Sequence, residues 1–160
     1  MQNIRSPLRA LRRRTGGFTL IEVMIAVAII GILVRLAYPV YTQSVLKSHR
    51  AEAKAALLDL ASREERYFST TNQYTSTGPS LGYATGTTLT AAAPLPVLTG
   101  NTAYYNLSIQ VPAPAASSPS FLATATAVGS QVNDTKCLDY SLSQSGVQTV
   151  DGTDSAGNCW

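Results

Sequence analysis

The sequence is poor in charge and in histidine, and each shortage narrows the classes of function that it can serve. Only 13% of its 160 residues are Asp, Glu, Lys or Arg, which suits an assembled or extracytoplasmic protein better than a solvated cytosolic one. His49 is the single histidine, and the sequence has no glycine-rich phosphate loop and no cluster of metal ligands. A lone histidine on a charged helical stretch usually lies at the surface. We therefore expect no enzyme, no metal and no other cofactor.

Cysteine is scarce too, because the sequence contains only Cys137 and Cys159. No histidine or further cysteine lies near them in the sequence, so their spacing does not indicate a metal site. They form either a disulfide or two free thiols, and the choice depends on the compartment in which this part of the chain resides.

Positive charge is concentrated at the start of the chain. The net charge of +3 depends on five arginines within residues 1–17, a segment without any acidic residue. Without this segment seven basic residues face nine acidic ones, and from Phe68 onward a single lysine, Lys136, faces four aspartates. Such a surface has no basic stripe that could neutralise phosphates, so we do not expect nucleic acid as a partner of the C-terminal part.

An apolar run follows the basic segment. From Phe18 to Val34 the only charged side chain is Glu22, and Arg35 and Tyr38 follow the run. A helix of this length spans about 25 Å, and a basic flank, an apolar core and interfacial tyrosines are typical of a membrane-inserted helix. An ionised carboxylate in a bilayer costs roughly 2.5–3.5 kcal/mol, so Glu22 is either a functional residue or a helix-start residue close to the headgroups.

The residues at this junction resemble the processing site of type IV pilins and related pseudopilins. The matching segment is Gly17-Phe18-Thr19-Leu20-Ile21-Glu22. In that family a prepilin peptidase cleaves after the glycine and methylates the new amino terminus. The resemblance implies cleavage between Gly17 and Phe18 and N-methylation of Phe18. Residues 1–17 are then a leader that has to be excluded from the fold.

The resemblance also implies a role for Glu22 in subunit assembly. Cleavage creates a cation at Phe18, which needs an anionic partner in a low-dielectric setting, and a glutamate of a neighbouring subunit can supply it. Gly31 and Pro39 fit the family's first helix and are expected weak points, since proline lacks a backbone donor and clashes with the preceding turn. A static kink and a segment that loses helical structure in the filament both remain open.

The anchor decides the compartment of the two cysteines. The arginines of the leader hold the amino terminus in the cytoplasm, which places the C-terminal part in the periplasm. In that oxidising compartment we expect Cys137 and Cys159 to form a disulfide, worth on the order of 3 kcal/mol in the chain-entropy model.

Residues 18–72 are expected to form one long helix, with residues 18–38 as the transmembrane and assembly segment. The second part is amphipathic, because apolar residues between Leu57 and Phe68 follow the helical spacing. Asp59 and Arg63 are spaced for an exposed i,i+4 ion pair. The face opposite to the apolar one carries Arg50, Lys54 and Glu65.

The rest of the chain predicts a loop and a sheet. Residues 73–102 are rich in glycine, proline and polar residues and are expected to form an αβ-loop. Residues 103–160 contain strand-like runs such as Tyr105 to Val111, where apolar and polar residues alternate. They predict a roughly four-stranded antiparallel sheet with a C-terminal disulfide loop. The fold class is therefore α+β, a pilin fold in which the long helix packs on the sheet.

The C-terminal half resembles the PilE-type minor pilins. The similar segments are Tyr104-Tyr105-Asn106-Leu107-Ser108-Ile109, Thr135-Lys136-Cys137 and Gly157-Asn158-Cys159-Trp160. The resemblance implies a structural pilus subunit, a single-pass protein of the bacterial inner membrane that later enters an extracellular pilus for twitching motility and adhesion. Its implied partners are other pilin subunits, the prepilin peptidase/methyltransferase and the inner-membrane assembly platform. A major and a minor subunit both stay open.

Two alternatives share this architecture. A type II secretion pseudopilin often has a C-terminal calcium site, for which Asp151 and Asp154 are the available acids. A competence pilin binds DNA, for which a local patch around Lys136 would be the support. Arg35 departs from the family pattern, which has a small apolar residue there, and it either snorkels to the headgroups or meets a carboxylate in the assembled filament.

Overall fold

The structure, a computed structural model, describes residues 17–84, 88–112 and 119–160. The predicted leader therefore lies outside the described residues, except for Gly17. The chain forms two compact units, one ending at Val40 and the other running from Tyr41 to Trp160.

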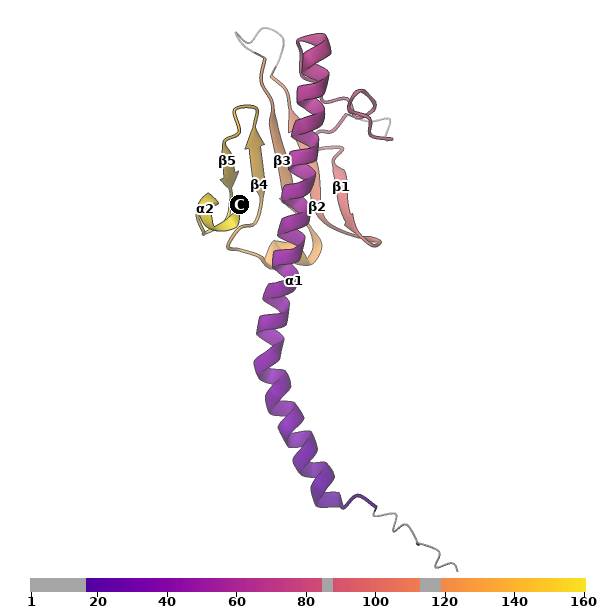
Figure 1. Cartoon of the computed structure of the whole chain (residues 1–160), viewed down its shortest axis with the longest axis vertical. Coiled ribbons are helices and arrows are strands. Elements are labelled where there is room, and N and C mark those ends of the chain that lie inside the picture. Colours follow the sequence, from indigo (N-terminus) through magenta and orange to yellow (C-terminus); the bar gives the residue numbers. More distant parts are fainter. Residues whose placement is uncertain (1–16, 85–87, 113–118) are drawn as a thin grey trace, which may run out of the picture. The chain divides into compact units, whose positions relative to one another are not determined.

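The helix predicted for residues 18–72 is α1 (Leu20–Thr71), shown in Figure 1. It ends before Asn72, whose φ of 55° is the left-handed conformation with which helices often terminate and which asparagine tolerates. The Asn72 N–H donates to the carbonyl of Phe68 at 2.8 Å, so one of the last carbonyls of the helix is satisfied.

In the first unit, α1 is apolar on all sides and its side chains are exposed. The large apolar side chains from Leu20 to Val40 are more than half exposed. An 18-residue window of α1 has a mean hydropathy of 2.5, and none of it is buried. By length and composition this stretch is able to cross a membrane.

In the second unit, five antiparallel strands form one sheet in the order of the sequence, β1-β2-β3-β4-β5. The strands are β1 (Leu95–Thr99), β2 (Thr102–Gln110), β3 (Leu122–Ala127), β4 (Tyr140–Ser143) and β5 (Gln148–Val150). Two short helices, η1 (Pro79–Leu81) and η2 (Gly129–Asn133), occur in the connections, and a third, α2 (Ala156–Cys159), follows β5. The predicted antiparallel meander is present, but with five strands in place of the expected four.

The additional strand, β1, lies within residues 73–102, which the sequence predicts to be a loop. Pro94 and Pro96 favour the loop prediction because proline cannot donate to a strand ladder. However, β1 is an edge strand that pairs only with β2, so its outer side needs no donor. The pairing register shifts between Val97 and Leu98, an irregularity typical of sheet edges.

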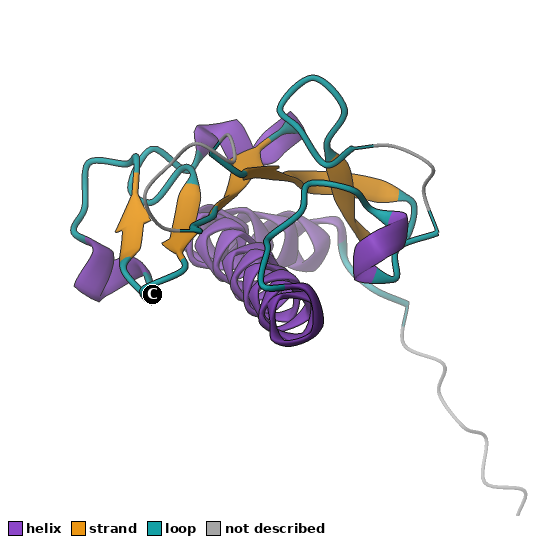
Figure 2. Cartoon of the chain, turned by 90° about the horizontal axis from the view of Figure 1, so that it is seen from above, coloured by secondary structure: helices purple, strands orange, loops and turns teal. Residues whose placement is uncertain are grey.

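The core of the second unit lies between one face of the sheet and the second half of α1, which covers that face in Figure 2. The helix contributes Leu57 and Leu60, both fully buried, at the spacing that the sequence predicts. Leu107 and Ile109 of β2 are 2% exposed, as the alternation in that strand predicts. Each buried side chain of this size contributes about 1.5–3 kcal/mol through the hydrophobic effect.

Candidate functional site

The predicted cleavage site lies immediately before α1. Gly17 and Phe18 belong to no helix or strand, and both are exposed, Phe18 to 82%. The peptide bond between them therefore lies in exposed chain outside any helix or strand. The structure places the predicted Glu22 on the first turn of α1, three residues after Thr19.

Sequence reasoning missed the role of Thr19. Its Oγ1 accepts a hydrogen bond from the Glu22 N–H at 3.3 Å, so Thr19 caps the N-terminus of α1. The signal was available, because threonine followed three residues later by glutamate is the sequence of a capping box. Glu22 thus lies at the positive end of the helix dipole, where a negatively charged side chain is stabilising.

The predicted weak points lie inside regular helix. Gly31 and Pro39 are both within α1, which is assigned as helix without interruption from Leu20 to Thr71. Pro39 has no N–H to donate to the carbonyl of Arg35 one turn earlier. Arg35, the departure from the family pattern, is exposed, and Glu22 and Arg35 are the charged side chains on this part of α1.

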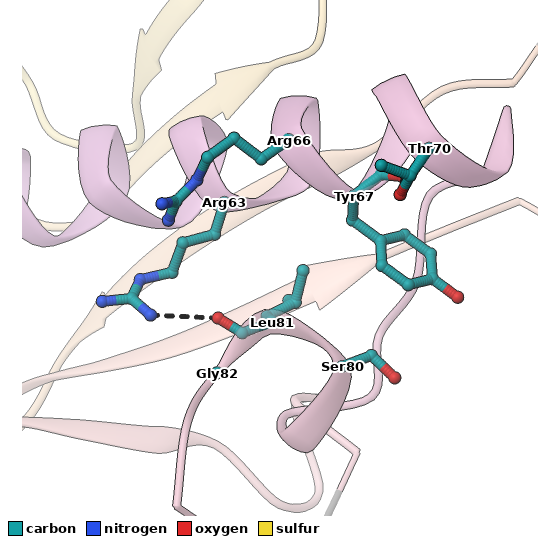
Figure 3. Close-up of a pocket in the computed structure, with 7 residues that line it drawn as sticks. All are labelled: Arg63, Arg66, Tyr67, Thr70, Ser80, Leu81 and Gly82. Atoms are coloured by element: carbon teal, nitrogen blue, oxygen red, sulfur yellow. Dashed lines mark hydrogen bonds between the residues drawn. The ribbon is translucent and has the colours of Figure 1, made fainter.

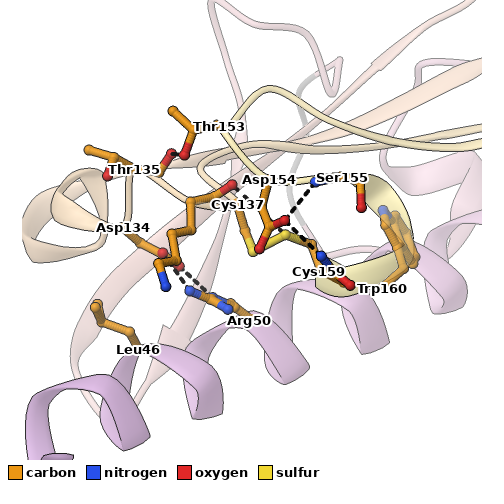
Figure 4. The surroundings of a disulfide bond; sticks show 12 residues. Leu46, Arg50, Asp134, Thr135, Cys137, Thr153, Asp154, Ser155, Cys159 and Trp160 are labelled. Atoms are coloured by element: carbon orange, nitrogen blue, oxygen red, sulfur yellow. Dashed lines mark hydrogen bonds and ion pairs between the residues drawn. A yellow bond between two sulfur atoms is a disulfide. The ribbon is translucent and has the colours of Figure 1, made fainter.

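The structure joins Cys137 and Cys159 in a disulfide, the pairing that the sequence predicts. Their Cα atoms are 5.7 Å apart, and both residues are almost fully buried. Figure 4 shows the bond beside α1. Lys54 Nζ donates to the carbonyl of Cys159 at 3.0 Å. The disulfide loop is therefore also hydrogen-bonded to α1.

The C-terminal loop is held further by main-chain and side-chain hydrogen bonds. The N–H of Asp154 donates to the Lys136 carbonyl at 2.8 Å, on the other side of the disulfide. Asp154 Oδ1 accepts from Asn158 Nδ2 at 2.8 Å and from the Ser155 N–H at 2.9 Å. The hydrogen bond from Asn158 lowers the pKa of Asp154 below its ordinary value, and the hydrogen bond from the Ser155 N–H lowers it further.

These contacts bear on the calcium alternative. Asp154 already has two donors from its own loop, and the described residues contain no group of three or more His, Cys, Asp or Glu side chains arranged to hold a metal ion. The loop is instead closed by the disulfide and by Trp160, whose Nε1 donates to the carbonyl of Thr149 at 3.2 Å.

Part of the polar face of α1 is covered by the C-terminal part of the chain. Arg50 forms a bidentate ion pair with the buried carboxylate of Asp134, which Gln131 Nε2 also contacts at 3.0 Å. Lys54 contacts the disulfide loop, as described above. The sequence does not predict these contacts, because their partners belong to the C-terminal part and helical periodicity alone does not reveal them.

His49 also corrects a prediction, since it was expected at the surface. It is 6% exposed, and its ring stacks on Tyr104 with centroids 3.6 Å apart and planes at 16°. Its Nδ1 lies 3.6 Å from Glu52 Oε2. The single histidine thus packs between α1 and β2. Among the described residues neither of its ring nitrogens has a hydrogen-bond partner, so no nucleophile is paired with it there.

A groove of about 430 Å³ lies between α1 and η1. Its lining includes Arg63, Arg66, Tyr67, Thr70 and Ser80 (Figure 3). The guanidinium of Arg63 already has two partners, because its Nε donates to Asp59 and its Nη1 donates to the carbonyl of Leu81 at 3.0 Å. Among the described residues Arg66 takes part in no ion pair, so it supplies the available positive charge of the groove.

Glu64 is the most perturbed acid of the second unit. It is fully buried beneath the start of the αβ connection, and its Oε2 accepts from the Thr75 N–H at 3.1 Å. Its Oε1 has no hydrogen-bond partner in the described part of the chain. Burial raises the pKa of Glu64 to about 7, against the lowering effect of the Thr75 hydrogen bond.

Comparisons with known proteins place the chain in a family. The family model described as "Type IV minor pilin ComP, DNA uptake sequence receptor" matches residues 39–141. A second model, "Prokaryotic N-terminal methylation motif", matches residues 12–35. Together they cover both the apolar helix and most of the second unit.

Individual relatives match over shorter stretches. The chain is 41% identical over 71 residues to the type IV major pilin protein PilA of Myxococcus xanthus (strain DK1622), which is 44% of this chain and 32% of that protein. It is 51% identical over 43 residues to the fimbrial protein EcpC of Eikenella corrodens, 27% of this chain and 28% of the relative. The matched stretches are thus about a third of the length of these relatives or less.

A solved structure, of a type IV pilin from Shewanella oneidensis, aligns over 72% of this chain and 97% of that chain, with 23% identity and a TM-score of 0.44. Family membership rests on the family models, because the first of them matches more than half of the chain. The chain belongs to the type IV pilins, in the family described as type IV minor pilin ComP, DNA uptake sequence receptor.

Proposed function

We propose that this pilin is a structural subunit that enters a type IV pilus through residues 18–38, and that it is a minor, PilE-type subunit. One observation carries the proposal: the first unit exposes nearly all of its apolar side chains, whereas the second unit encloses a core of its own. Burial in lipid, and then among other pilin helices, covers the apolar surface of the first unit.

Processing comes first in this function. Prepilin peptidase/methyltransferase cleaves between Gly17 and Phe18 and methylates Phe18, and the exposure of these residues outside any helix or strand supports this assignment. Mass spectrometry of the mature protein from pilus and membrane fractions tests it. An intact leader or another amino terminus would refute the processing step.

The membrane stage and its partners complete the proposal. The subunit resides in the bacterial inner membrane with its amino terminus in the cytoplasm and its C-terminal domain in the periplasm, where the pilus assembly platform receives it. The disulfide supports a periplasmic location, because such bonds persist in oxidising compartments. A reporter enzyme that works only in the periplasm should be active when it is fused after Trp160. One that works only in the cytoplasm should be inactive at the same position.

Glu22 is proposed to direct assembly by pairing with the Phe18 amine of an adjacent subunit. A buried charge without a partner is strongly destabilising, so Glu22→Ala should leave a membrane-inserted, disulfide-bonded protein that enters pili poorly. The variant is compared with wild type in a deletion strain by measuring the subunit in sheared pili. Normal incorporation would refute the role of Glu22.

Gly31 and Pro39 are proposed as the points at which α1 can lose helical structure within the filament. Proline leaves one helical hydrogen bond unmade, and glycine is less favourable than alanine in a helix by about 1 kcal/mol. Gly31→Ala should slow amide hydrogen exchange within residues 31–39 of this subunit in pili, while incorporation continues. Unchanged exchange would contradict this assignment.

The decisive experiment measures abundance and phenotype together. Sheared pili from the native host are analysed by quantitative mass spectrometry, and a deletion strain is assayed for pili, twitching motility and adhesion. A minor subunit should be present at a small fraction of the main subunit, with loss of twitching on deletion. Absence from pili, with a secretion defect instead, would favour the type II secretion pseudopilin.

Binding of DNA is a second candidate function, because the matching family model is described as a DNA uptake sequence receptor. The groove beside η1 offers Arg66 as a free cation, although the sequence from Phe68 onward is acidic. Arg66→Glu and Lys136→Glu would be compared in duplex-DNA binding over a range of salt. A loss confined to Arg66→Glu, with a smaller salt slope, would support a DNA site in the groove.

We assign no catalytic function to the chain. Its single histidine is stacked on Tyr104, and a nucleophile, a base and an orienting group do not converge among the described residues.

A further inference from the structure

The charges of the first unit are the starting point. Between Phe18 and Leu46, Glu22 and Arg35 are the only charged side chains, and both are exposed on an otherwise apolar helix surface. If this helix is buried among pilin helices, as proposed above, both charges leave water. A guanidinium does not give up its proton in a protein, so Arg35 remains a cation and needs an anionic partner there.

The two residues cannot pair within one chain. Both lie on α1, which is regular helix from Leu20 through Arg35. Thirteen residues of helix separate them by ~20 Å along the axis and by roughly 140° around it. Glu22 and Arg35 therefore point to nearly opposite sides of the helix at different heights.

We propose that Arg35 of one copy forms an ion pair with Glu22 of a second copy of this chain. The helices are parallel, and the second copy is displaced by ~20 Å along the axis so that its Glu22 lies level with Arg35. Glu22 is the only acidic residue before Glu52 in the sequence, so it is the only carboxylate that a second copy of this chain offers in this part of the helix. The inference rests on the proposed assembly through residues 18–38, and it requires that copies of this minor subunit lie next to one another in the pilus and are not scattered singly among the main subunits.

The opposite orientation of the two side chains has a consequence for symmetry. Each copy presents Arg35 to one neighbour and Glu22 to another, so the contact uses two different surfaces. Contacts of this heterologous kind close into a ring or continue into an open helical filament, and a two-fold dimer cannot satisfy both charges. The pair thus specifies a stagger and a direction of growth for the assembly.

The pair is compatible with the Phe18 amine as a second partner of Glu22. A carboxylate has two oxygens and about four lone-pair sites, so one glutamate can accept from an amine and from a guanidinium together. Arg35 would then supply a permanent positive charge at a position where the family normally has a small apolar residue. Before assembly, its long side chain can reach the headgroup region.

Thiol cross-linking measures the stagger between copies while Glu22 and Arg35 stay unchanged. Ile25 and Tyr38 follow Glu22 and Arg35 by three residues each, so they lie on the same sides of the helix and keep the same 13-residue offset. Chains with Ile25→Cys and chains with Tyr38→Cys are co-expressed with different tags, and their sheared pili are treated with a short thiol-specific cross-linker. Ile32→Cys replaces Tyr38→Cys in the control, because Ile32 lies on the side of Arg35 but ~10 Å from the expected height.

The expected result is a cross-link for positions 25 and 38 that clearly exceeds the control with position 32. Arg35→Met should lower this product to the control level or remove the subunit from pili, while Arg35→Lys, which keeps the cation, should preserve it. Normal incorporation with an unchanged cross-link in Arg35→Met would overturn the ion pair. If pili contain the protein but give the cross-link between positions 25 and 32, or neither cross-link, the proposed stagger is wrong. The proposed function would then remain intact. Absence of the unaltered protein from pili would overturn the proposed function, and this inference with it.

Discussion

Arg50 donates two hydrogen bonds to Asp134, from Nε to Oδ2 at 2.5 Å and from Nη2 to Oδ1 at 2.6 Å. The residues are 84 apart in the sequence, and the pair fixes α1 to the segment after η2. The Asp134 side chain is 2% exposed, and Gln131 supplies its third hydrogen bond. A buried pair of this kind matters most when one partner is lost, because the other charge is then buried alone.

Asp134→Ala should destabilise the second unit by about 3–5 kcal/mol, since it leaves the Arg50 guanidinium without its carboxylate. The loss is measured by denaturant unfolding of the purified full-length protein in detergent, followed by a spectroscopic signal of the sheet. Arg50→Met in the same background should recover part of the stability, because it removes the unpaired charge.

Asp59 provides the matched control. It pairs with Arg63 at 2.7 Å, but the Asp59 side chain is 52% exposed. Asp59→Ala should therefore cost no more than about 1 kcal/mol. Equal losses for the two aspartates would contradict the argument that burial makes the Arg50–Asp134 pair important.

Gly152→Ala should damage the disulfide loop. A Cβ atom at Gly152 would lie 2.1 Å from the Lys136 carbonyl oxygen and 2.6 Å from the Cys137 nitrogen, so two backbone segments would have to separate. The expected outcome is a lower melting temperature and a disulfide that is reduced faster by dithiothreitol. Overpacking of this kind costs typically 1–3 kcal/mol.

Gly157→Ala is the companion substitution in the same loop. No atom lies within 4 Å of a Cβ built at Gly157, so the change should leave stability close to that of the wild type. A similar loss at both glycines would point to a general loss of loop flexibility and against the backbone contact at Gly152.

The disulfide should contribute about 3 kcal/mol to stability, because it closes a short loop and restricts the unfolded chain. Cys137→Ser combined with Cys159→Ser tests this value against the wild type under oxidising conditions. In native protein, mass analysis without reduction should find neither thiol open to alkylation. Free thiols in correctly folded protein would show that the bond is absent under physiological conditions.

The helix and the sheet face could be predicted because their signals are local. The apolar run from Phe18 and the alternation through Tyr105 and Ile109 are periodic patterns, and the structure places them as predicted. The four-residue spacing of Asp59 and Arg63 likewise predicts the ion pair that is present. A disulfide follows from two cysteines once an anchor defines the compartment.

What could not be predicted depends on residues far apart in the sequence. The burial of His49 requires Tyr104, and the burial of Arg50 requires Asp134, so the helix alone suggests a solvated face. Strand β1 was missed because its prolines are acceptable only at a sheet edge, and edge position is a property of the whole sheet.

Stability of the second unit should fall as the pH rises from about 5 to 8, because of Glu64. Burial raises the pKa of Glu64 from 4.5 to about 7 in the folded protein. A raised carboxyl pKa means that the folded state favours the protonated acid, so this contribution is fully present below pH 4.5 and is lost as the pH rises through about 7. At 1.36 kcal/mol for each pKa unit, the loss amounts to at most about 3 kcal/mol.

The measurement is the free energy of unfolding at pH 5 and pH 8, in wild type and in Glu64→Gln. Glutamine keeps an oxygen for the Thr75 N–H and carries no charge, so most of the pH dependence should disappear, mainly through a gain at pH 8. A small slope of the same sign should remain, since burial also raises the pKa of Asp139. Glu65→Gln, at the exposed neighbouring position, should retain most of the wild-type slope, because the charge of Glu65 raises the pKa of Glu64 less than burial does. If the variant at Glu64 keeps the full pH dependence, another group is responsible and the buried carboxyl is not protonated on folding.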